Sequence, residues 1–363
     1  MSWVGNRKER HVRRGLKISL VTLTGAALTL SASACGGKKT SGGSDDEGGK
    51  KTLKVGLAFD IGGRGDQSFN DSAAAGLDKV KKDLNIQTEE ISAKPDEPDA
   101  DKEARLKLLA GKGYNPIIGV GFAYTNAVNK VAKDYPNTKF LVVDADQCKV
   151  EGANVEGACF SEEQGSFLVG AAAALKSKTN TIGFIGGVNV PLIHKFQAGY
   201  EAGAKKAKPG IKVLPAKYLT QPPNFDGFKN PALGNEAAKG QLDAGADVIY
   251  HAAGGAGIGV IKTVGAAKKW AIGVDSDQYN LPAVAEAKEQ ILTSMVKRVD
   301  LSVYDFVKSV SDNTFKGGTK KYDLSNDGVA YSVSGGKIDD IKAKLDELKA
   351  DIVSGKITVP VKP

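Results

Sequence analysis

The sequence of 363 residues contains only three histidines and three cysteines, which limits the catalytic and metal-binding chemistry that it can carry. His11 lies in the N-terminal stretch, and His194 and His251 are isolated. There is no HExxH motif, no cysteine cluster spaced for zinc and no Ser/His/Asp or Cys/His signature of a nucleophile. We therefore expect that the protein is not an enzyme and uses neither a metal ion nor a cofactor.

A large basic surplus is also missing from the part of the chain that is expected to fold. The whole chain has 50 basic and 42 acidic residues, but residues 1–34 hold six of the basic residues and only one acid. The rest therefore carries 44 basic and 41 acidic side chains. A nucleic-acid-binding protein keeps its basic surplus on the folded domain, so we expect no nucleic-acid partner.

The apolar core of "LKISLVTLTGAALTLSASAC" near the N-terminus has the length of a signal-peptide core and is short for a membrane span. Small residues precede Cys35, as in a bacterial lipobox, whose cysteine is acylated. Residues 1–34 are therefore predicted to be a lipoprotein signal peptide, and Cys35 to anchor the protein to the outer face of the cytoplasmic membrane. The alternative is an ordinary signal peptide cut elsewhere, and Arg13-Arg14 leaves the Sec and twin-arginine export routes open.

The next segment, residues 35–52, is rich in Gly, Ser and charged residues and is predicted to be a flexible tether. In an extracytoplasmic compartment the two remaining cysteines can be oxidised. We therefore expect a disulfide between Cys148 and Cys159, with two buried free thiols as the alternative.

From residue 53 onward, apolar runs typical of buried strands alternate with helical patterns, in two series that meet near Thr179. The alternation predicts parallel sheets with helices on both faces. The fold class is therefore α/β, with two doubly wound lobes. Residues 290–310 add one more strand and helix, "VAYSV" reads as another strand, and "KIDDIKAKLDELKADIVSG" is a strongly amphipathic helix.

Three of the apolar runs end in an aspartate, at Asp60, Asp144 and Asp275. Ligands of open α/β sheets bind outside the carboxyl ends of the strands, although each acid alone could equally cap a helix. Phe69 and Asn70 follow the glycine-rich turn after the first acid. Together these residues predict a cleft for a polar small molecule with a sugar, whose hydroxyls donate to carboxylates, and a flat ring, which stacks on an aromatic side chain.

Several segments resemble the basic membrane lipoprotein family, namely "DQSFNDSAAAGL", "GVGFAYTNAVNKVAKDYP", "KFLVVDA", "SEEQGSFLVGAAAAL", "GADVIYHAAGGAGIGVI", "IGVDSDQ" and "LTSMVKRVD". These are substrate-binding lipoproteins of ABC importers, similar to the purine nucleoside receptor type. The resemblance implies the type I periplasmic-binding-protein fold, with a ligand cleft between two lobes joined by three crossovers. We expect lobe one at residues 53–178 plus 276–315, and lobe two at residues 179–275 plus 316–363.

The resemblance also implies roles for individual residues. Asp60 and Asp275 match acids that bind ribose hydroxyls, and Lys297 matches a lysine at the same site. Phe69 and Phe228 match the two rings that sandwich the base. Phe225 is the alternative for the second ring, and Phe228 is preferred because it stands immediately before the run "KNPALG".

Further positions are implied close to the base. Asn70 matches a base-contacting asparagine, Gly254 or Gly255 matches a glycine that lies close to the ligand, and Asp144 is another candidate for a base contact. Asn126 stands where the family often has an acid. This departure leaves the base preference open.

The expected protein is a monomeric, lipid-anchored receptor that binds nucleosides, with purine nucleosides as the expected class, and delivers them to an ABC permease. One alternative is a receptor for a sugar or an autoinducer. Another is a nucleoside hydrolase acting through the two ribose-binding acids, against which the lack of a partnered general acid argues. A third is the sensor domain of a transcription regulator, against which the lipobox argues.

Overall fold

The computed structural model describes residues 52–94 and 97–363. The predicted signal peptide, Cys35 and the tether up to residue 51 lie outside the described residues. Among the residues that are described, none of the helices combines the length and the apolar character needed to cross a membrane.

The first sheet has six parallel strands in the order β12-β5-β4-β3-β1-β2. Most of them are short, buried apolar runs, which is typical of parallel strands covered on both faces. The bounds are β1 Lys54–Phe59, β2 Gln87–Ser92, β3 Ile117–Val120, β4 Phe140–Val143, β5 Val155–Phe160 and β12 Gly318–Tyr322.

The second sheet has the order β13-β11-β10-β9-β6-β7, with β8 also paired to β6. Its pairings are parallel except that of β13, which runs antiparallel to β11. The bounds are β6 Thr181–Val188, β7 Lys212–Val213, β8 Lys217–Thr220, β9 Val248–Ala252, β10 Trp270–Asp275, β11 Ile291–Lys297 and β13 Val329–Tyr331.

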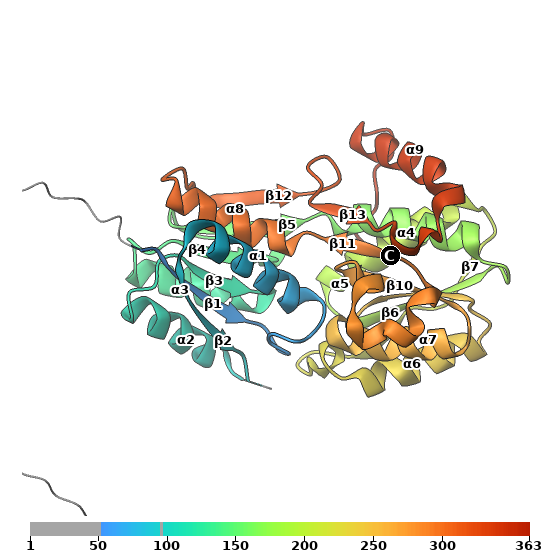
Figure 1. Cartoon of the computed structure of the whole chain (residues 1–363), viewed down its shortest axis with the longest axis horizontal. Coiled ribbons are helices and arrows are strands. Elements are labelled where there is room, and N and C mark those ends of the chain that lie inside the picture. Colours follow the sequence, from blue (N-terminus) through green and yellow to red (C-terminus); the bar gives the residue numbers. More distant parts are fainter. Residues whose placement is uncertain (1–51, 95–96) are drawn as a thin grey trace, which may run out of the picture. The chain divides into compact units, whose positions relative to one another are not determined.

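The helices cover both faces of each sheet (Figure 1). In the first lobe α2 and α3 pack on one face, and α1 and α8 on the other. In the second lobe α6 and α7 pack on one face, and α4 and α5 on the other. The bounds are α1 Phe69–Leu84, α2 Asp99–Gly111, α3 Thr125–Asp134, α4 Glu162–Lys176, α5 Pro191–Ala207, α6 Pro231–Asp243, α7 Gly257–Ala266, α8 Val299–Ser311 and α9 Lys342–Val353.

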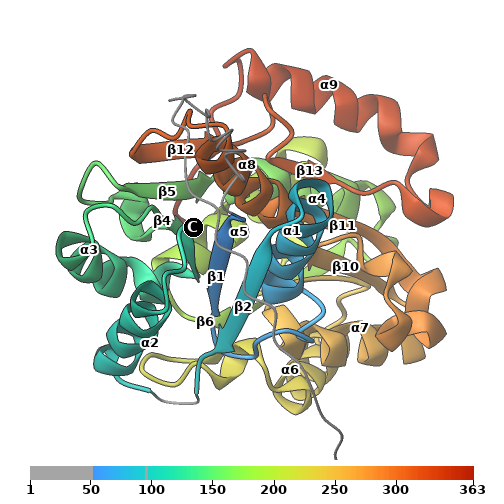
Figure 2. The same cartoon turned by 60° about the vertical axis from the view of Figure 1, so that its left-hand side comes forward.

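The chain passes between the two sheets three times. It leaves the first sheet after β5, returns to it after β11, and crosses again between β12 and β13. As a result α8 lies beside α1 although the two helices are far apart in sequence (Figure 2). Gly76 makes this approach possible, because a Cβ there would overlap the backbone of Asp300.

This topology corrects the expected lobe boundaries. Residues 276–315 were expected in lobe one, but β11 extends the second sheet by pairing with β10. Residues 316–363 were expected in lobe two, but β12 pairs with β5 in the first sheet. Helix α4, expected in lobe one, packs against α5. Strand β12 was not predicted at all, because "GTKKY" is mostly exposed and has no apolar pattern.

The expected disulfide is present in the structure. Cys148 and Cys159 are bonded, with a Cα–Cα distance of 5.6 Å. The bond joins the short 3₁₀ helix Asp146–Cys148, which follows β4, to the C-terminal part of β5. It therefore closes the loop between two neighbouring strands of the first sheet, next to the position of Asp144.

Candidate ligand-binding site

The loop after β1 brings an aspartate to the edge of the first sheet. The backbone N–H of Asp60 donates to Asn70 Oδ1 (3.1 Å), and the N–H of Ile61 donates to the Asp60 carboxylate (2.8 Å). The turn that follows needs glycine, because Gly62 and Gly63 have φ values of 98° and 60°. Asn70 in the first turn of helix α1 thus holds the backbone of Asp60, and the N–H of Ile61 holds its carboxylate.

Asp66, which precedes helix α1 in the sequence, caps the N-terminus of this helix. Its carboxylate accepts from the backbone N–H groups of Ser68 (2.9 Å), Asn70 (2.8 Å) and Asp71 (3.0 Å). It also accepts from the side-chain amide of Asn70 at 3.0 Å. An acid at a helix N-terminus satisfies donors that the helix itself cannot. It fixes the first turn, from which Phe69 projects into the pocket.

The two other strand-end acids both adopt the left-handed backbone conformation. Asp144 has φ 61° after β4, and Asp275 has φ 64° at the end of β10. This conformation costs energy for residues other than glycine and is found at ligand sites. Both side chains are buried and both line one pocket, although they come from different sheets.

Lys297, at the end of β11, is the buried cation of this site. Its Nζ lies 2.6 Å from Asp144 Oδ2 and 3.0 Å from Glu162 Oε1, and the Lys297 side chain is only 2% exposed. The same Nζ lies 5.3 Å from the ring centroid of Phe69 and 5.6 Å from that of Phe196, close enough for cation–π attraction. The ammonium group of Lys297 is therefore contacted by both charged and aromatic side chains.

Burial is the largest single influence on the pKa values of the acids around the pocket. It raises the pKa of Asp60 to about 6. It also raises the pKa of Asp275 to about 6, although the charge of Lys297 opposes the shift. Burial raises the pKa of Asp144 as well, again against Lys297. For Glu162 burial acts in the same direction, but Lys297 and Lys195 outweigh it and its pKa lies below the ordinary value.

Lys297 shows the reciprocal effect. Burial favours the neutral amine, but the charges of Asp144, Glu162 and Asp275 outweigh it, so the pKa of Lys297 is raised above its ordinary value. The lysine is therefore protonated at neutral pH. It offsets only part of the negative charge of the acids around it.

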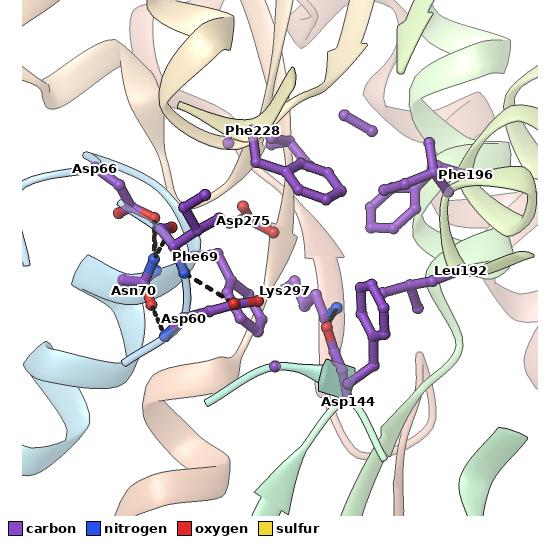
Figure 3. Close-up of a pocket in the computed structure, with 17 residues that line it drawn as sticks. Asp60, Asp66, Phe69, Asn70, Asp144, Leu192, Phe196, Phe228, Asp275 and Lys297 are labelled. Atoms are coloured by element: carbon purple, nitrogen blue, oxygen red, sulfur yellow. Dashed lines mark hydrogen bonds and ion pairs between the residues drawn. The ribbon is translucent and has the colours of Figure 1, made fainter. Parts of the chain in front are cut away.

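Aromatic and aliphatic side chains from both lobes line the same pocket as these charges (Figure 3). Phe69 comes from the first helix of lobe one, whereas Phe228 ends the 3₁₀ helix Asp226–Phe228 of lobe two. Leu192 and Phe196 come from helix α5. The complete lining is Asp60, Ile61, Asp66, Phe69, Asn70, Gly121, Phe122, Asp144, Leu192, Ile193, Phe196, Phe228, Ala252, Gly254, Val274, Asp275 and Lys297.

Most of the predicted site residues come together in this pocket. The eight that line it are Asp60, Phe69, Asn70, Asp144, Phe228, Gly254, Asp275 and Lys297. Gly255 follows Gly254 in the same turn but does not line the pocket. Asn126 lies instead in the adjoining outer part of the cleft, together with Phe225. The choice of Phe228 over Phe225 as a pocket residue is therefore consistent with the geometry.

Phe225 has a different position at the mouth of the pocket. Its ring centroid lies 6.2 Å from that of Phe122, with the ring planes tilted by 54°. Phe122 lines both the pocket and the outer part of the cleft. The pair thus joins the two lobes where the pocket opens outward.

The sequence interpretation missed several lining residues. Phe122 could have been found, because it lies two residues after β3, close to the strand end as Asp60 is to the end of β1. Leu192, Ile193 and Phe196 carried no such signal, since apolar positions in a helix usually face the core of their own lobe. Within the described part of the chain no group of His, Cys, Asp or Glu side chains is arranged to hold a metal ion.

Solved structures with the same arrangement identify the class. A solute-binding protein of an ABC transporter system from Aeropyrum pernix K1 superposes with a TM-score of 0.73 at 27% sequence identity, covering 85% of this chain and 94% of that one. Two α/β lobes, three crossovers and a pocket between the lobes define the type I periplasmic-binding-protein fold.

The family follows from sequence comparison. Residues 53–362 match the family described as "ABC transporter substrate-binding protein PnrA-like". The CD4+ T-cell-stimulating antigen of Listeria innocua is 35% identical, over 96% of this chain and 98% of that protein. The ABC transporter nucleoside-binding protein BmpA of Lactococcus lactis subsp. cremoris is 33% identical, over 96% of this chain and 99% of that protein. The chain belongs to the PnrA-like family of ABC transporter substrate-binding proteins.

Proposed function

We propose that this substrate-binding protein takes up a nucleoside in the pocket between its lobes. The observation that carries the proposal is the combination of two aromatic rings, Phe69 and Phe228, with the carboxylates of Asp60 and Asp275 in one pocket. Phenyl rings offer a stacking surface for a planar base. Ionised carboxylates act only as acceptors and suit the hydroxyl donors of a sugar. The Lactococcus relative is a nucleoside-binding protein, which supports the same ligand class.

In the proposed complex each lobe supplies one ring and one ribose-reading acid. Asp60 and Phe69 belong to the first lobe, and Phe228 and Asp275 to the second. Asp144 Oδ1 is buried and has no hydrogen-bond partner among the described residues, so it is available to a donor on the ligand. Lys297, Asn70 and the backbone near Gly254 complete the polar surroundings.

We further propose that the protein acts without turning over its ligand, as a lipid-anchored monomer that presents the nucleoside to a permease outside the cytoplasmic membrane. A bound ligand that touches both lobes favours the closed arrangement, and hinge closure is the usual response of such binding proteins. The lipid anchor rests on the sequence before Cys35, outside the described residues.

Isothermal titration calorimetry tests the ligand class. Adenosine, inosine and guanosine are compared with adenine, hypoxanthine, ribose and the 2′- and 3′-deoxynucleosides. We expect the nucleosides to bind far more tightly than the free bases or ribose. Asp275→Ala should weaken nucleoside binding roughly 10- to 150-fold, since a hydrogen bond to a charged group contributes about 1.5–3 kcal/mol. Equal affinity for adenine and adenosine contradicts ribose recognition.

Chromatography of each nucleoside after incubation with the protein tests the absence of turnover. We expect the nucleoside to be recovered intact. If the wild type released the free base and Asp275→Ala did not, the pocket would hydrolyse its ligand rather than carry it.

A further inference from the structure

Ser68 precedes helix α1 at the N-cap position, yet its side chain does not cap that helix. A serine in this position normally accepts from the backbone N–H groups of the first turn. Here Asp66 takes over those donors, the N–H groups of Asn70 and Asp71. The hydroxyl of Ser68 is thus not needed by its own helix.

That hydroxyl donates to a residue of the other lobe instead. Ser68 Oγ lies 2.5 Å from Asp275 Oδ2, and Ser68 itself is fully buried. A distance of this size is typical of a charge-assisted hydrogen bond from a hydroxyl to a carboxylate. Ser68 belongs to the first lobe and Asp275 to the second, so this bond joins the two lobes.

A second inter-lobe bond lies beside the first. The side-chain amide of Gln278 donates to the backbone carbonyl of Gln67 at 3.3 Å. Gln278 is fully buried, and its own carbonyl oxygen accepts from the backbone N–H of Val274 and lies 3.0 Å from His251 Nε2. These contacts fix the amide in the orientation that directs its donor at the first lobe.

We propose that Ser68 is a positioning residue that latches the lobes together and holds one oxygen of Asp275, so that the other oxygen is set for a ligand hydroxyl. This inference rests on the proposed function and extends it. Asp275 lines the pocket whereas Ser68 does not, so Ser68 acts through the acid and not on the ligand. Among the described side chains, Ser68 is the one donor recorded to this carboxylate.

The latch couples closure to recognition. In the open form the lobes part, Ser68 leaves Asp275, and water solvates the carboxylate. On closure the serine replaces one of these water contacts, and the ligand hydroxyl replaces another. The closed state therefore gains both hydrogen bonds at once. A ligand without the matching hydroxyl forms only one of them and stabilises the closed state less.

The test compares Ser68→Ala with Ser72→Ala in the full-length protein. Ser72 lies one turn further along α1, and its hydroxyl accepts from the backbone N–H of Asp300 within lobe one at 3.2 Å. It is therefore a matched serine that does not bridge the lobes. We expect Ser68→Ala to weaken nucleoside binding roughly 10- to 150-fold, mainly through faster dissociation, and Ser72→Ala to leave the affinity unchanged.

Two readouts separate the latch from a general structural role. Ser68→Ala should lower the preference for a ribonucleoside over its 2′- or 3′-deoxy form, whereas a general structural defect would weaken the binding of both forms equally. In the Asp275→Ala background the same substitution should change the affinity less than about threefold, because the two residues act as one unit. Additive losses, wild-type affinity in Ser68→Ala, or an equal effect of Ser72→Ala overturn the proposal.

If the wild-type protein binds no nucleoside, the proposed function fails, and the latch is then judged on the free protein. Small-angle X-ray scattering measures the fraction of closed molecules without ligand. Ser68→Ala should lower this fraction relative to the wild type and Ser72→Ala. An unchanged fraction overturns the latch.

Discussion

Lys297 Nζ lies 2.6 Å from Asp144 Oδ2, which forms a buried ion pair between the last residue of a strand in the second sheet and a strand-end acid of the first. Glu162, where the chain first crosses between the lobes, lies within 3.0 Å of the same ammonium. The cation thus joins both lobes and a crossover at the floor of the pocket.

Removing this cation should destabilise the free protein strongly. Breaking a buried ion pair leaves an uncompensated charge and costs about 3–5 kcal/mol. We therefore expect Lys297→Met to lower the free energy of unfolding by about that amount, measured by urea denaturation. Lys79→Met is the control, since Lys79 pairs with Asp83 on the exposed face of α1 and should leave the stability unchanged. Equal effects of both variants contradict a structural role for Lys297.

The stacking role of the two pocket rings predicts a loss of affinity on truncation. Stacking of a base on an aromatic side chain contributes about 1–3 kcal/mol. Phe69→Ala and Phe228→Ala should each weaken nucleoside binding by about 5- to 150-fold, measured by calorimetry. Phe315→Ala is the control, because its ring packs against Phe306 away from the pocket. Wild-type affinity in Phe69→Ala would mean that this ring contributes only to packing.

Acidification should weaken ligand binding. Burial raises the pKa of Asp275 to about 6, and a protonated carboxyl is a poorer acceptor for a ligand hydroxyl. Between pH 7.5 and 5 we expect the affinity to fall roughly tenfold for each acid of this kind that contacts the ligand. Asp275→Asn should flatten the profile, because asparagine does not titrate. An affinity that is constant over this range contradicts the role of ionised acids.

Asp275 should also make the stability of the free protein depend on pH. Here acidification should be stabilising, whereas it weakens ligand binding. The folded-state pKa of Asp275, about 6, lies above the ordinary value of 3.8, so the folded state holds the proton more tightly. Its stabilising contribution is present below about pH 4 and is lost as the pH rises through about 6. The free energy of unfolding of the wild type relative to that of Asp275→Asn, measured in urea, should therefore fall as the pH rises from about 4 to about 6.

The disulfide between Cys148 and Cys159 should stabilise the first lobe. Closing a loop with 11 residues of sequence separation restricts the unfolded chain, and bonds of this kind contribute about 2–4 kcal/mol. The double variant Cys148→Ser/Cys159→Ser should lose a comparable free energy of unfolding. Non-reducing peptide mapping of freshly exported protein should find the linked pair, and two free thiols would contradict it.

The predicted acylation of Cys35 concerns a residue outside the described part. We expect mass spectrometry of membrane-bound protein to find a mature N-terminus at Cys35 that carries lipid, and Cys35→Ala to leave unprocessed or released protein. An unlipidated N-terminus at another position would refute the anchor.

The sequence alone determined the α/β class, the number of lobes and eight of the 17 residues that line the pocket. Asp60, Asp144 and Asp275 could be found because an acid directly after a buried parallel strand lies at the sheet edge where ligands bind. The family resemblance supplied Lys297 and the second ring, Phe228. It also supplied the expectation that the chain crosses between the lobes three times.

Only the tertiary structure decided where those crossings fall and which residues meet across the cleft. Strand β12 joins the first sheet through backbone hydrogen bonds with β5, and such bonds leave no trace in side-chain pattern. The bond between Ser68 and Asp275 spans 207 residues of sequence, and it depends on Asp66 having taken over the helix cap. Local patterns specify which groups a strand or helix can present, whereas lobe packing decides which of those groups come within hydrogen-bond distance.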